Sequence, residues 1–298
     1  MHLHDSAPPG RGIYCNRTLN MRSIKVVGYD MDYTLVHYRV HWERRAYDHL
    51  KQRLLGRGLP IEQLTFDAKL VVRGVIIDTH RGNFLKTNRF GYIKRAYHGT
   101  TLIDHARVRQ QYMRRIVSLR DSRYHFMNTL FALSEGCMYA QLVDMLDAGK
   151  LGEHALGYQD LYELVRDNIN AAHTEGELKT EIMRDPAKYV VLEEDTVLTL
   201  LDQKHAGKRL MLITNSEWSY TLAMMRYAFD RFMPTRQTWR DLFDVVIVAA
   251  RKPHFFDNQS PLLEIVDDDG LMRPLTGALK PKHSYFGGNA VALEQHLG

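Results

Sequence analysis

Two aspartates stand two residues apart, directly after the first apolar segment of the sequence. Residues 24–29 are almost continuously apolar, and Asp30 and Asp32 follow them. One carboxylate of such a pair can attack phosphorus and form an aspartyl-phosphate. The other can protonate the leaving oxygen and later activate water. An Asp-x-Asp pair alone is weakly specific, because it also occurs in other metal-binding motifs and in solvated turns.

Polar residues of matching chemistry follow two further apolar segments. Residues 209–213 are followed by Thr214, and residues 245–249 are followed closely by Lys252. A hydroxyl and an ammonium group can bind phosphoryl oxygens, where negative charge must be stabilised in the transition state. A Mg²⁺ ion would keep the two carboxylates from repelling each other. The three polar ends together indicate phosphoryl transfer.

The three apolar segments have the pattern of strands buried on both faces of a parallel sheet. Residues 218–232, between the second and third segments, have apolar residues at helical spacing. Alternating strands and helices predict an α/β fold with a doubly wound parallel sheet. Ligands of such sheets bind at the carboxyl ends of the strands, which is where the polar residues fall.

A long insert, residues 38–190, separates the first strand from the second. It is too long for a loop, so we expect a second folded unit there. The chain would then have two domains. The core would comprise residues 1–37 together with 191–298, and the insert would be the second domain. Within the insert the patterns predict a helix at 42–55, a β-meander at 70–97, and helices at 129–146 and 160–182. After the third strand, residues 262–272 are expected to form a hairpin that turns at 267–270.

Composition excludes several classes of protein. Of the 298 residues, 45% are hydrophobic and 25% are charged, which is typical of a soluble globular protein. The two cysteines, Cys15 and Cys137, lack C-x-x-C spacing, which argues against a disulfide framework and a structural zinc site. No apolar run reaches the length of a membrane span, and the N-terminal residues are polar. We therefore expect a cytoplasmic protein without a membrane partner.

The net charge of +5 indicates an anionic partner. The basic residues are spread along the chain and are densest at 107–123. Apolar residues at roughly helical spacing interrupt that stretch, which favours an amphipathic helix with a solvated basic face over a nucleic-acid surface. We expect no nucleic-acid partner, and a mild positive field that steers a small phosphorylated substrate.

The motifs together resemble the haloacid dehalogenase-like (HAD) phosphatases. The first motif, DxDx[TV], is matched at 30–34. The second motif, a strand that ends in Ser or Thr, is matched at Thr214, and the basic third motif is matched at Lys252. More specifically, the chain is similar to the cytosolic purine 5′-nucleotidases of the IMP-GMP specific type. Matching segments cover nearly the whole chain: 16–21, 28–35, 129–133, 212–216, 250–256 and 286–289. The resemblance implies a HAD-like Rossmannoid sheet with a large α+β cap, the insert, after the first core strand.

The resemblance also implies a role for each motif residue. Asp30 would be the nucleophile and Asp32 the general acid and base. Thr214 and Asn215 would bind phosphate, and Lys252 would stabilise its charge. Mg²⁺ would be bound by the Asp30 carboxylate and the backbone carbonyl of Asp32.

In the insert, the segment 166–173 with Lys179 is similar to the family's substrate-recognition helix. Substrate contacts are implied for four residues: Arg166, Asn170, His173 and Lys179. Phe131 falls on the position that stacks against the base, although without the resemblance a core role for it is the better interpretation. Position 170 departs from the family's usual Asp, which leaves the base preference open.

The sequence thus predicts an Mg²⁺-dependent 5′-nucleotidase that hydrolyses purine nucleoside 5′-monophosphates, IMP-like or GMP-like, through an aspartyl-phosphate. Two alternatives stay open: a nucleotide-binding or regulatory protein with little turnover, and a HAD phosphatase for another small phosphoester. The family's fourth-motif Asp lies beyond a further strand, soon after 286–289, and the chain ends at Gly298. We therefore expect a chain truncated before that motif. A homo-oligomer is compatible with the sequence.

Overall fold

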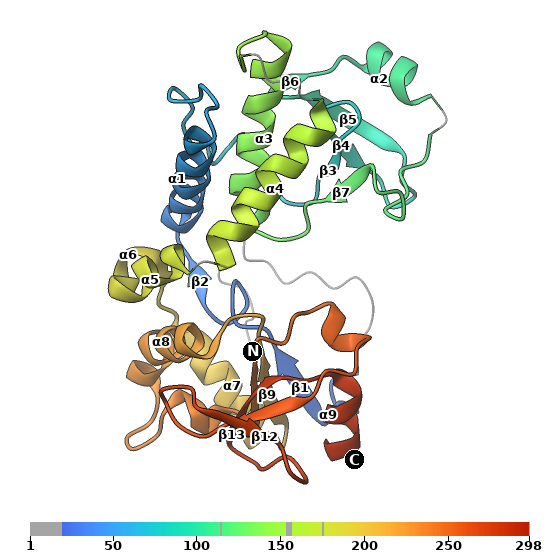
Figure 1. Cartoon of the computed structure of the whole chain (residues 1–298). Coiled ribbons are helices and arrows are strands. Elements are labelled where there is room, and N and C mark those ends of the chain that lie inside the picture. The colour runs from blue at the N-terminus through green and yellow to red at the C-terminus, as the bar shows by residue number, and fades with distance from the viewer. Residues whose placement is uncertain (1–19, 114, 153–156, 175, 298) are drawn as a thin grey trace, which may run out of the picture.

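The computed structural model describes residues 20–113, 115–152, 157–174 and 176–297. A six-stranded sheet with its helices forms the lower half of the molecule in Figure 1, and a five-stranded sheet with its helices forms the upper half. Among the described residues, no helix combines the length and the apolar character needed to cross a bilayer.

The six-stranded sheet has the strand order β1-β9-β10-β13-β11-β12. Its strands are β1 (Val26–Tyr29), β9 (Arg209–Ile213), β10 (Val245–Val248), β13 (His283–Gly287), β11 (Leu262–Ile265) and β12 (Met272–Pro274). The first four are parallel to one another, and β11 and β12 form the expected antiparallel hairpin. The prediction of an α/β fold with a parallel sheet is confirmed.

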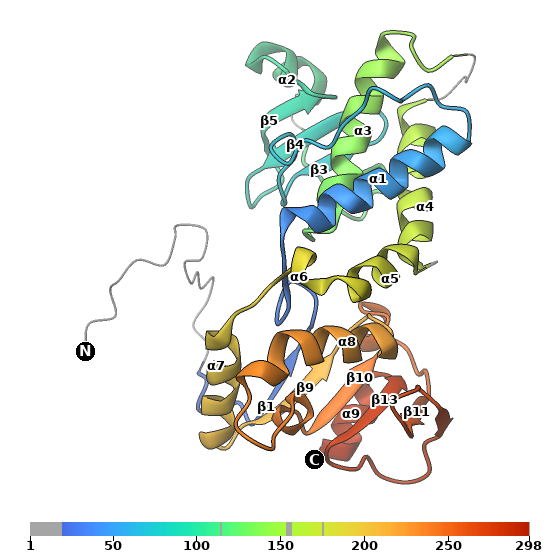
Figure 2. The ribbon, with the colours of Figure 1, turned by 90° about the vertical axis from the view of Figure 1, so that its left-hand side faces the viewer.

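Helices cover both faces of this sheet (Figure 2). They are α7 (Glu194–His205), α8 (Trp218–Phe229) and α9 (Ala290–Leu297), with short 3₁₀ turns η2 (Asp230–Phe232), η3 (Trp239–Leu242) and η4 (His254–Phe256). Because side chains alternate along a strand, Leu210 and Leu212 pack in the same apolar cluster as α7 and α8 residues, whereas Met211 packs in the cluster of Leu293 from α9. The helix expected at 218–232 is α8 followed by η2.

Strand β1 differs from its prediction. β10 is buried along its whole length, but β1 is only partly buried and Gly28 within it is exposed. The reason is its place at the edge of the sheet, where β9 is its neighbour. In addition, Val26 and Gly28 line an open cavity beside α9, so the expectation of burial on both faces is wrong for this strand.

The insert is joined to the core by two short strands that pair antiparallel, β2 (His37–Tyr38) and β8 (Val190–Val191). Between them lies an antiparallel sheet of order β6-β5-β4-β3-β7. Its strands are β3 (Ile76–Asp78), β4 (Asn83–Thr87), β5 (Ile93–His98), β6 (Thr101–Leu102) and β7 (Tyr124–Phe126), and the helices of the insert are α1 (Val40–Gly56), α2 (His105–Tyr112), α3 (Ala132–Asp147), α4 (Tyr158–Thr174), α5 (Glu177–Arg184) and α6 (Pro186–Tyr189). The predicted first helix and β-meander are confirmed.

Two helix predictions in the insert are wrong in extent. The segment 160–182 is not one helix but α4 and α5, because Gly176 between them has a φ of 79°, a left-handed conformation that suits glycine. The segment 107–123 is helical only to Tyr112. Beyond it, the Val117 N–H donates to the Gly91 carbonyl at 3.0 Å and the Val117 side chain packs on the sheet, so the chain follows the sheet instead of continuing the helix.

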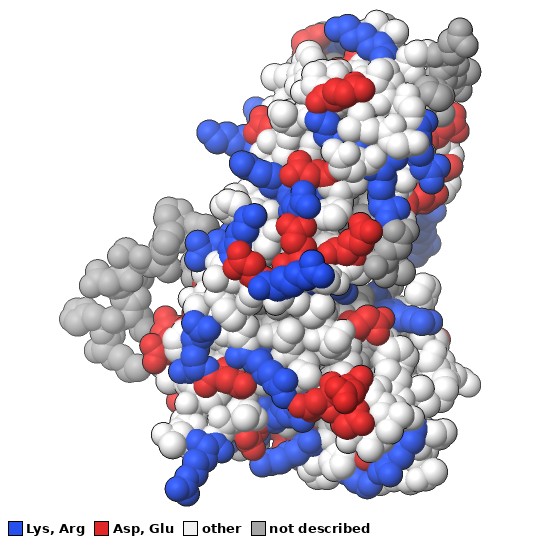
Figure 3. Space-filling view, turned by 60° about the vertical axis from the view of Figure 1, so that its left-hand side comes forward, with Lys and Arg blue, Asp and Glu red and all other residues white. Residues whose placement is uncertain are grey.

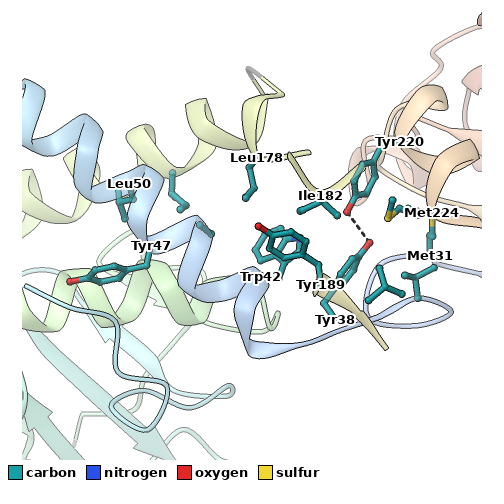
Figure 4. Packing of buried hydrophobic residues seen from close by; sticks show 14 of the residues in the cluster. Met31, Tyr38, Trp42, Tyr47, Leu50, Leu178, Ile182, Tyr189, Tyr220 and Met224 are labelled. Carbon is teal, nitrogen blue, oxygen red and sulfur yellow. Dashed lines mark hydrogen bonds between the residues drawn. The ribbon is translucent and has the colours of Figure 1, made fainter. Parts of the chain in front are cut away.

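One apolar cluster continues from the core into the insert. Figure 4 shows Met31 and Tyr220 of the core facing Trp42, Ile182 and Tyr189 of the insert. These side chains are at most 3% exposed. The two units therefore share buried apolar surface where the chain crosses between them.

A buried carboxylate lies in this junction. Glu43 of α1 is 3% exposed, and its carboxylate accepts hydrogen bonds from the Tyr33 hydroxyl at 3.0 Å and from the Ser134 N–H at 3.1 Å. Burial raises the pKa of Glu43 to about 7, although the hydrogen bonds to the carboxylate oppose this rise. Glu43 thus links α1, the start of α3 and the loop after β1.

We expect the titration of Glu43 to weaken the fold as pH rises from about 4.5 to 7. In that window the folded state binds more protons than the unfolded state, so the free energy of unfolding falls as pH rises. The fall expected from this one group is about 3 kcal/mol. Urea unfolding of wild type and Glu43→Gln across this range measures it. The variant should gain stability relative to wild type as pH rises. A difference independent of pH would contradict the assignment.

Candidate active site

Three loops meet at the carboxyl ends of neighbouring strands of the larger sheet. Asp30 follows β1, Thr214 follows β9, and Lys252 lies four residues beyond β10. β9 pairs with both β1 and β10, so these loops are adjacent in space. The sequence-predicted motif residues therefore come together, as expected for a parallel sheet.

Asp30 and Lys252 are in direct contact. The Lys252 Nζ lies 3.0 Å from Asp30 Oδ1, and it also donates to the carbonyl of Ile213 at 2.6 Å. The Met31 N–H donates to the same Asp30 oxygen at 2.8 Å. Oδ2 of Asp30 has no hydrogen-bond partner among the described residues, and the side chain is 43% exposed. One oxygen of this carboxylate is thus held and the other is available to a ligand.

Asn215 fixes the loop that carries Lys252. Its Nδ2 donates to the Lys252 carbonyl at 3.0 Å, and the Lys252 N–H donates to Asn215 Oδ1 at 2.6 Å. This pair of bonds ties the loop after β9 to the loop after β10. In this structure the Asn215 amide positions the lysine, a role that sequence reasoning did not assign to it.

Thr214 is fully buried, and its hydroxyl accepts a hydrogen bond from the Ser216 N–H at 3.0 Å. Its own N–H donates to the Ile247 carbonyl at 2.9 Å. Both contacts shape the turn after β9. The phosphate contact of Thr214 stays a prediction.

The carboxylate of Asp32 is enclosed by hydroxyl groups. The Tyr38 hydroxyl donates to Oδ1 at 2.5 Å and the Ser216 hydroxyl donates to Oδ2 at 2.7 Å. Burial of the carboxylate raises the pKa of Asp32, and the two hydrogen bonds and the charge of Lys179 oppose this rise. Part of the residue reaches solvent. Burial thus shifts Asp32 toward the protonated form that a general acid needs, whereas the two hydroxyl donors favour the carboxylate.

A hydrogen-bonded chain extends from Asp32 toward the insert. The Tyr220 hydroxyl of α8 donates to the Tyr38 hydroxyl of β2 at 3.0 Å, as Figure 4 shows. The Nζ of Lys179, on α5 of the insert, lies 5.1 Å from the centre of the Tyr220 ring. Sequence reasoning missed Tyr38, Ser216 and Tyr220. Only Ser216 carried a signal, because it lies in the polar end after β9.

The insert contributes an aromatic side chain beside the same loop. Phe131 is partly buried, with its ring centre 4.8 Å from that of Tyr33 and 4.7 Å from that of Trp42, both edge-on. Tyr33 is the residue after Asp32. The structure thus places Phe131 and Lys179 at the junction near the motif residues.

The other predicted substrate residues lie along α4. Arg166 contacts the carboxylate of Asp167 at 3.1 Å and lies 5.9 Å from the centre of the Tyr162 ring. Asn170 is exposed on the same helix. The side chain of His173 is outside the described part of the structure. For these three residues a substrate contact stays a prediction.

The donors fit a magnesium ion only in part. Mg²⁺ takes oxygen ligands and is usually held by one or two carboxylates together with water and substrate phosphate. The available Oδ2 of Asp30 and the Asp32 carbonyl are donors of this kind. In the described ranges, however, no three His, Cys, Asp or Glu side chains cluster as they would around a metal. Water and phosphate would have to supply most of the coordination.

Two cavities differ in their relation to this site. One of about 480 Å³ reaches Asp30 and Lys252 and is lined mainly by apolar groups, including Met211 and Leu293. Another, of about 850 Å³, lies in the insert and includes no sequence-predicted site residue.

Comparison with known proteins decides the family. A family model described as the 5′ nucleotidase family matches residues 13–298. The chain belongs to the 5′ nucleotidase family. It is 27% identical to a 5′-nucleotidase domain-containing protein of Dictyostelium discoideum, over 93% of this chain and 48% of that protein. It is 28% identical to 5′-nucleotidase domain-containing protein 1 of Bos taurus, over 90% of this chain and 68% of that protein. The chain thus spans about half the length of the first relative.

We expect Tyr38→Phe to destabilise the fold by about 1–3 kcal/mol, because it leaves a buried carboxylate oxygen without its donor. Tyr29→Phe is the matched control: it removes the same hydroxyl from a hydrogen bond to the neutral side chain of Gln203, at 2.8 Å, and should cost less. Urea unfolding at neutral pH compares the two. An equal cost would contradict a special role for the Tyr38 hydroxyl.

Proposed function

We propose that this 5′ nucleotidase family member hydrolyses purine nucleoside 5′-monophosphates in the cytoplasm through an aspartyl-phosphate on Asp30. The core, residues 1–37 and 191–298, would be HAD-like, and the insert, residues 38–190, would be its cap. Family membership supports a nucleotide 5′-phosphate as the substrate. The observation that carries the proposal is the contact between Asp30 and Lys252 beside the Asp32 carboxylate, which the Tyr38 and Ser216 hydroxyls enclose.

The proposed reaction has two steps. Asp30 attacks phosphorus, a new P–O bond forms, and the bond to the nucleoside oxygen breaks while Asp32 gives that oxygen its proton. Asp32 then takes a proton from water, which attacks the aspartyl-phosphate and releases inorganic phosphate. Lys252 stabilises the negative charge of the transferring group in both steps. Asn215 keeps the lysine in place through its two hydrogen bonds to the Lys252 backbone.

Mg²⁺ would be held by the Asp30 carboxylate and the Asp32 carbonyl, and when bound it would neutralise negative charge between the carboxylate and the phosphate. Everything else in the scheme is carried by side chains of this chain. The Met31 N–H and Lys252 orient the Asp30 carboxylate, and Tyr38 and Ser216 orient Asp32.

The cap would select the base. Phe131 offers an aromatic face next to Tyr33, one residue from Asp32, and a purine has a larger stacking surface than a pyrimidine. Lys179 adds positive charge on the same side. Arg166, Asn170 and His173 would complete the contacts from α4. Asn170 can both donate and accept hydrogen bonds, so preference among IMP, GMP and AMP should be flatter than in family members with an Asp at this position.

We expect Asp30→Asn to abolish turnover, because an amide cannot form the acyl phosphate. Asp32→Asn should slow hydrolysis of nucleoside monophosphates by about 10²–10⁴-fold, because it removes proton transfer to the leaving oxygen. With p-nitrophenyl phosphate, whose leaving group needs no proton, formation of the aspartyl-phosphate should be much less affected. Phosphate release and burst kinetics, with and without Mg²⁺, measure both effects. Substantial activity of Asp30→Asn would refute the nucleophile.

We expect purine monophosphates to be hydrolysed with a higher kcat/KM than pyrimidine monophosphates. Phe131→Ala should reduce this preference by about tenfold, the value of one lost stacking contact. Phe90→Ala is a suitable control, because Phe90 is 59% exposed on the turn between β4 and β5. A panel of nucleoside monophosphates measures the ratio. Equal kcat/KM for both classes in wild type would contradict a purine site.

A further inference from the structure

One part of the insert carries the entire positive excess of the chain. Residues 69–123 contain 13 Lys or Arg and 3 Asp, and no Glu. The rest of the chain has 27 Lys or Arg against 32 Asp or Glu, out of totals of 40 and 35. This basic unit, residues 69–123, comprises β3 to β6 and α2, and lies at the end of the molecule away from the six-stranded sheet (Figures 1 and 2).

In the described structure, none of the three acids of the basic unit forms an ion pair with one of its exposed cations. Asp78 is fully buried and binds the Arg123 guanidinium through two hydrogen bonds of 2.6 Å. Asp104 and Asp121 each accept a backbone N–H, from Arg107 and Arg123. Ten cationic side chains are exposed and form no ion pair among the described residues: Lys69, Arg73, Lys86, Arg89, Lys94, Arg95, Arg107, Arg109, Arg115 and Arg120. By contrast, acidic and basic side chains are interspersed on the face in Figure 3.

A groove of about 480 Å³ lies between residues 67–75 and the strands β4 and β5. Lys86 of β4 stands directly opposite Arg95 of β5, and Phe84 stands opposite Tyr97. Residues two apart on a strand share a face, so the two cations and the two rings line the same side. Like charges directly opposite one another are destabilising, and a bound anion would relieve this repulsion.

The floor of the groove is apolar, with Val71 and Phe84 buried, and Tyr97 is 37% exposed above it. Lys69 adds a third cation to the lining. The one acidic residue in the lining of the groove is Asp67, and its carboxylate accepts the Lys69 backbone N–H at 2.8 Å. The groove therefore suits a ligand that has both phosphate groups and a flat apolar part.

Positive charge and exposed rings continue beyond the groove. Phe90 and Tyr92, on and beside the β4–β5 turn, are 59% and 48% exposed, and they are flanked by Arg89 and Lys94. A single mononucleotide would occupy the groove alone, whereas a charged strand would use the whole surface. We propose that the basic unit binds single-stranded nucleic acid, with phosphates on Lys86 and Arg95 and a base on Tyr97.

This site is separate from the proposed nucleotidase site. None of the residues assigned to hydrolysis lines the groove. The concave groove with its paired cations favours a flexible strand over the flat surface of an anionic membrane. Sequence analysis instead led us to expect no nucleic-acid partner, because along the chain the basic residues look dispersed.

The test is the salt dependence of binding. A fluorescent oligouridine of about 20 nucleotides is titrated with protein from about 50 to 200 mM KCl, with anisotropy as the signal. Wild type should bind, and Lys86→Glu with Arg95→Glu should bind at least about tenfold more weakly. For this double variant, the slope of log K for binding against log salt concentration should be shallower by about 1.4 than for wild type, the value for two lost phosphate contacts on a single strand. Arg44→Glu with Arg184→Glu, exposed on α1 and α5, is the control with the same change of charge and should leave the slope unchanged.

Stacking is tested at Tyr97. Tyr97→Ala should weaken binding by about tenfold, and Tyr97→Phe should preserve it, because the phenyl ring still stacks. Circular dichroism and thermal melting verify that each variant is folded. Lys86→Gln with Arg95→Gln replaces the double reversal if that variant does not fold. The kcat/KM for nucleoside monophosphates should not change in any of them, so this proposal and the proposed hydrolysis fail independently.

Several results would overturn the proposal. The first is that wild type shows no salt-dependent binding, and the second is that the Arg44/Arg184 control loses as much affinity as the Lys86/Arg95 variant. The third is that wild type binds a duplex of the same length with equal affinity. The fourth is that wild type binds phosphatidylserine vesicles but not the oligouridine. The last two would mean that the unit recognises charge on a duplex or on a lipid surface rather than an unstacked strand.

Discussion

The enclosure of the Asp32 carboxylate at the point where the chain passes between its two units is the constraint on which the rest of the structure depends. A buried carboxylate is costly unless hydroxyl or amide groups donate to it. Here one donor, Tyr38, belongs to the strand that leads into the insert, and the other, Ser216, belongs to the loop after β9. The core sheet and the connection to the insert must therefore keep a fixed relation for Asp32 to be satisfied.

The same junction connects the insert to the motif residues of the core. Tyr38 lies on β2, which pairs with β8, so both passages of the chain between the units form one small sheet. Tyr220 donates to Tyr38, and Lys179 lies over the Tyr220 ring. A shift of the insert would move these contacts together. Glu43, tied to Tyr33 and Ser134, adds a second buried polar connection across the same boundary.

The distribution of charged side chains does not follow the division of the chain into core and insert. The group around Asp30 and Lys252 is compact, and its one lysine contacts both a carboxylate and a carbonyl. In the described part of the basic unit, ten exposed cations form no ion pair, so its field is available to an external polyanion. The two proposed activities would thus use surfaces of distinct character: a small polar site on parallel strand ends and an extended cationic groove on an antiparallel sheet.

The sequence by itself determined what short-range patterns encode. Continuous apolar segments gave the parallel strands, the residues after them gave Asp30, Asp32, Thr214 and Lys252, and together they indicated the family. Tertiary structure decided the rest, since burial and partners depend on residues far apart in the chain. The fold placed β1 at the edge of the sheet, and it ended α2 at Tyr112 because the following segment packs on the five-stranded sheet. It also placed cations that are scattered along the sequence in one unit. It also brought Tyr38 and Tyr220 to Asp32, because a tyrosine in an apolar stretch has no local feature that distinguishes a hydrogen-bond donor from a core residue.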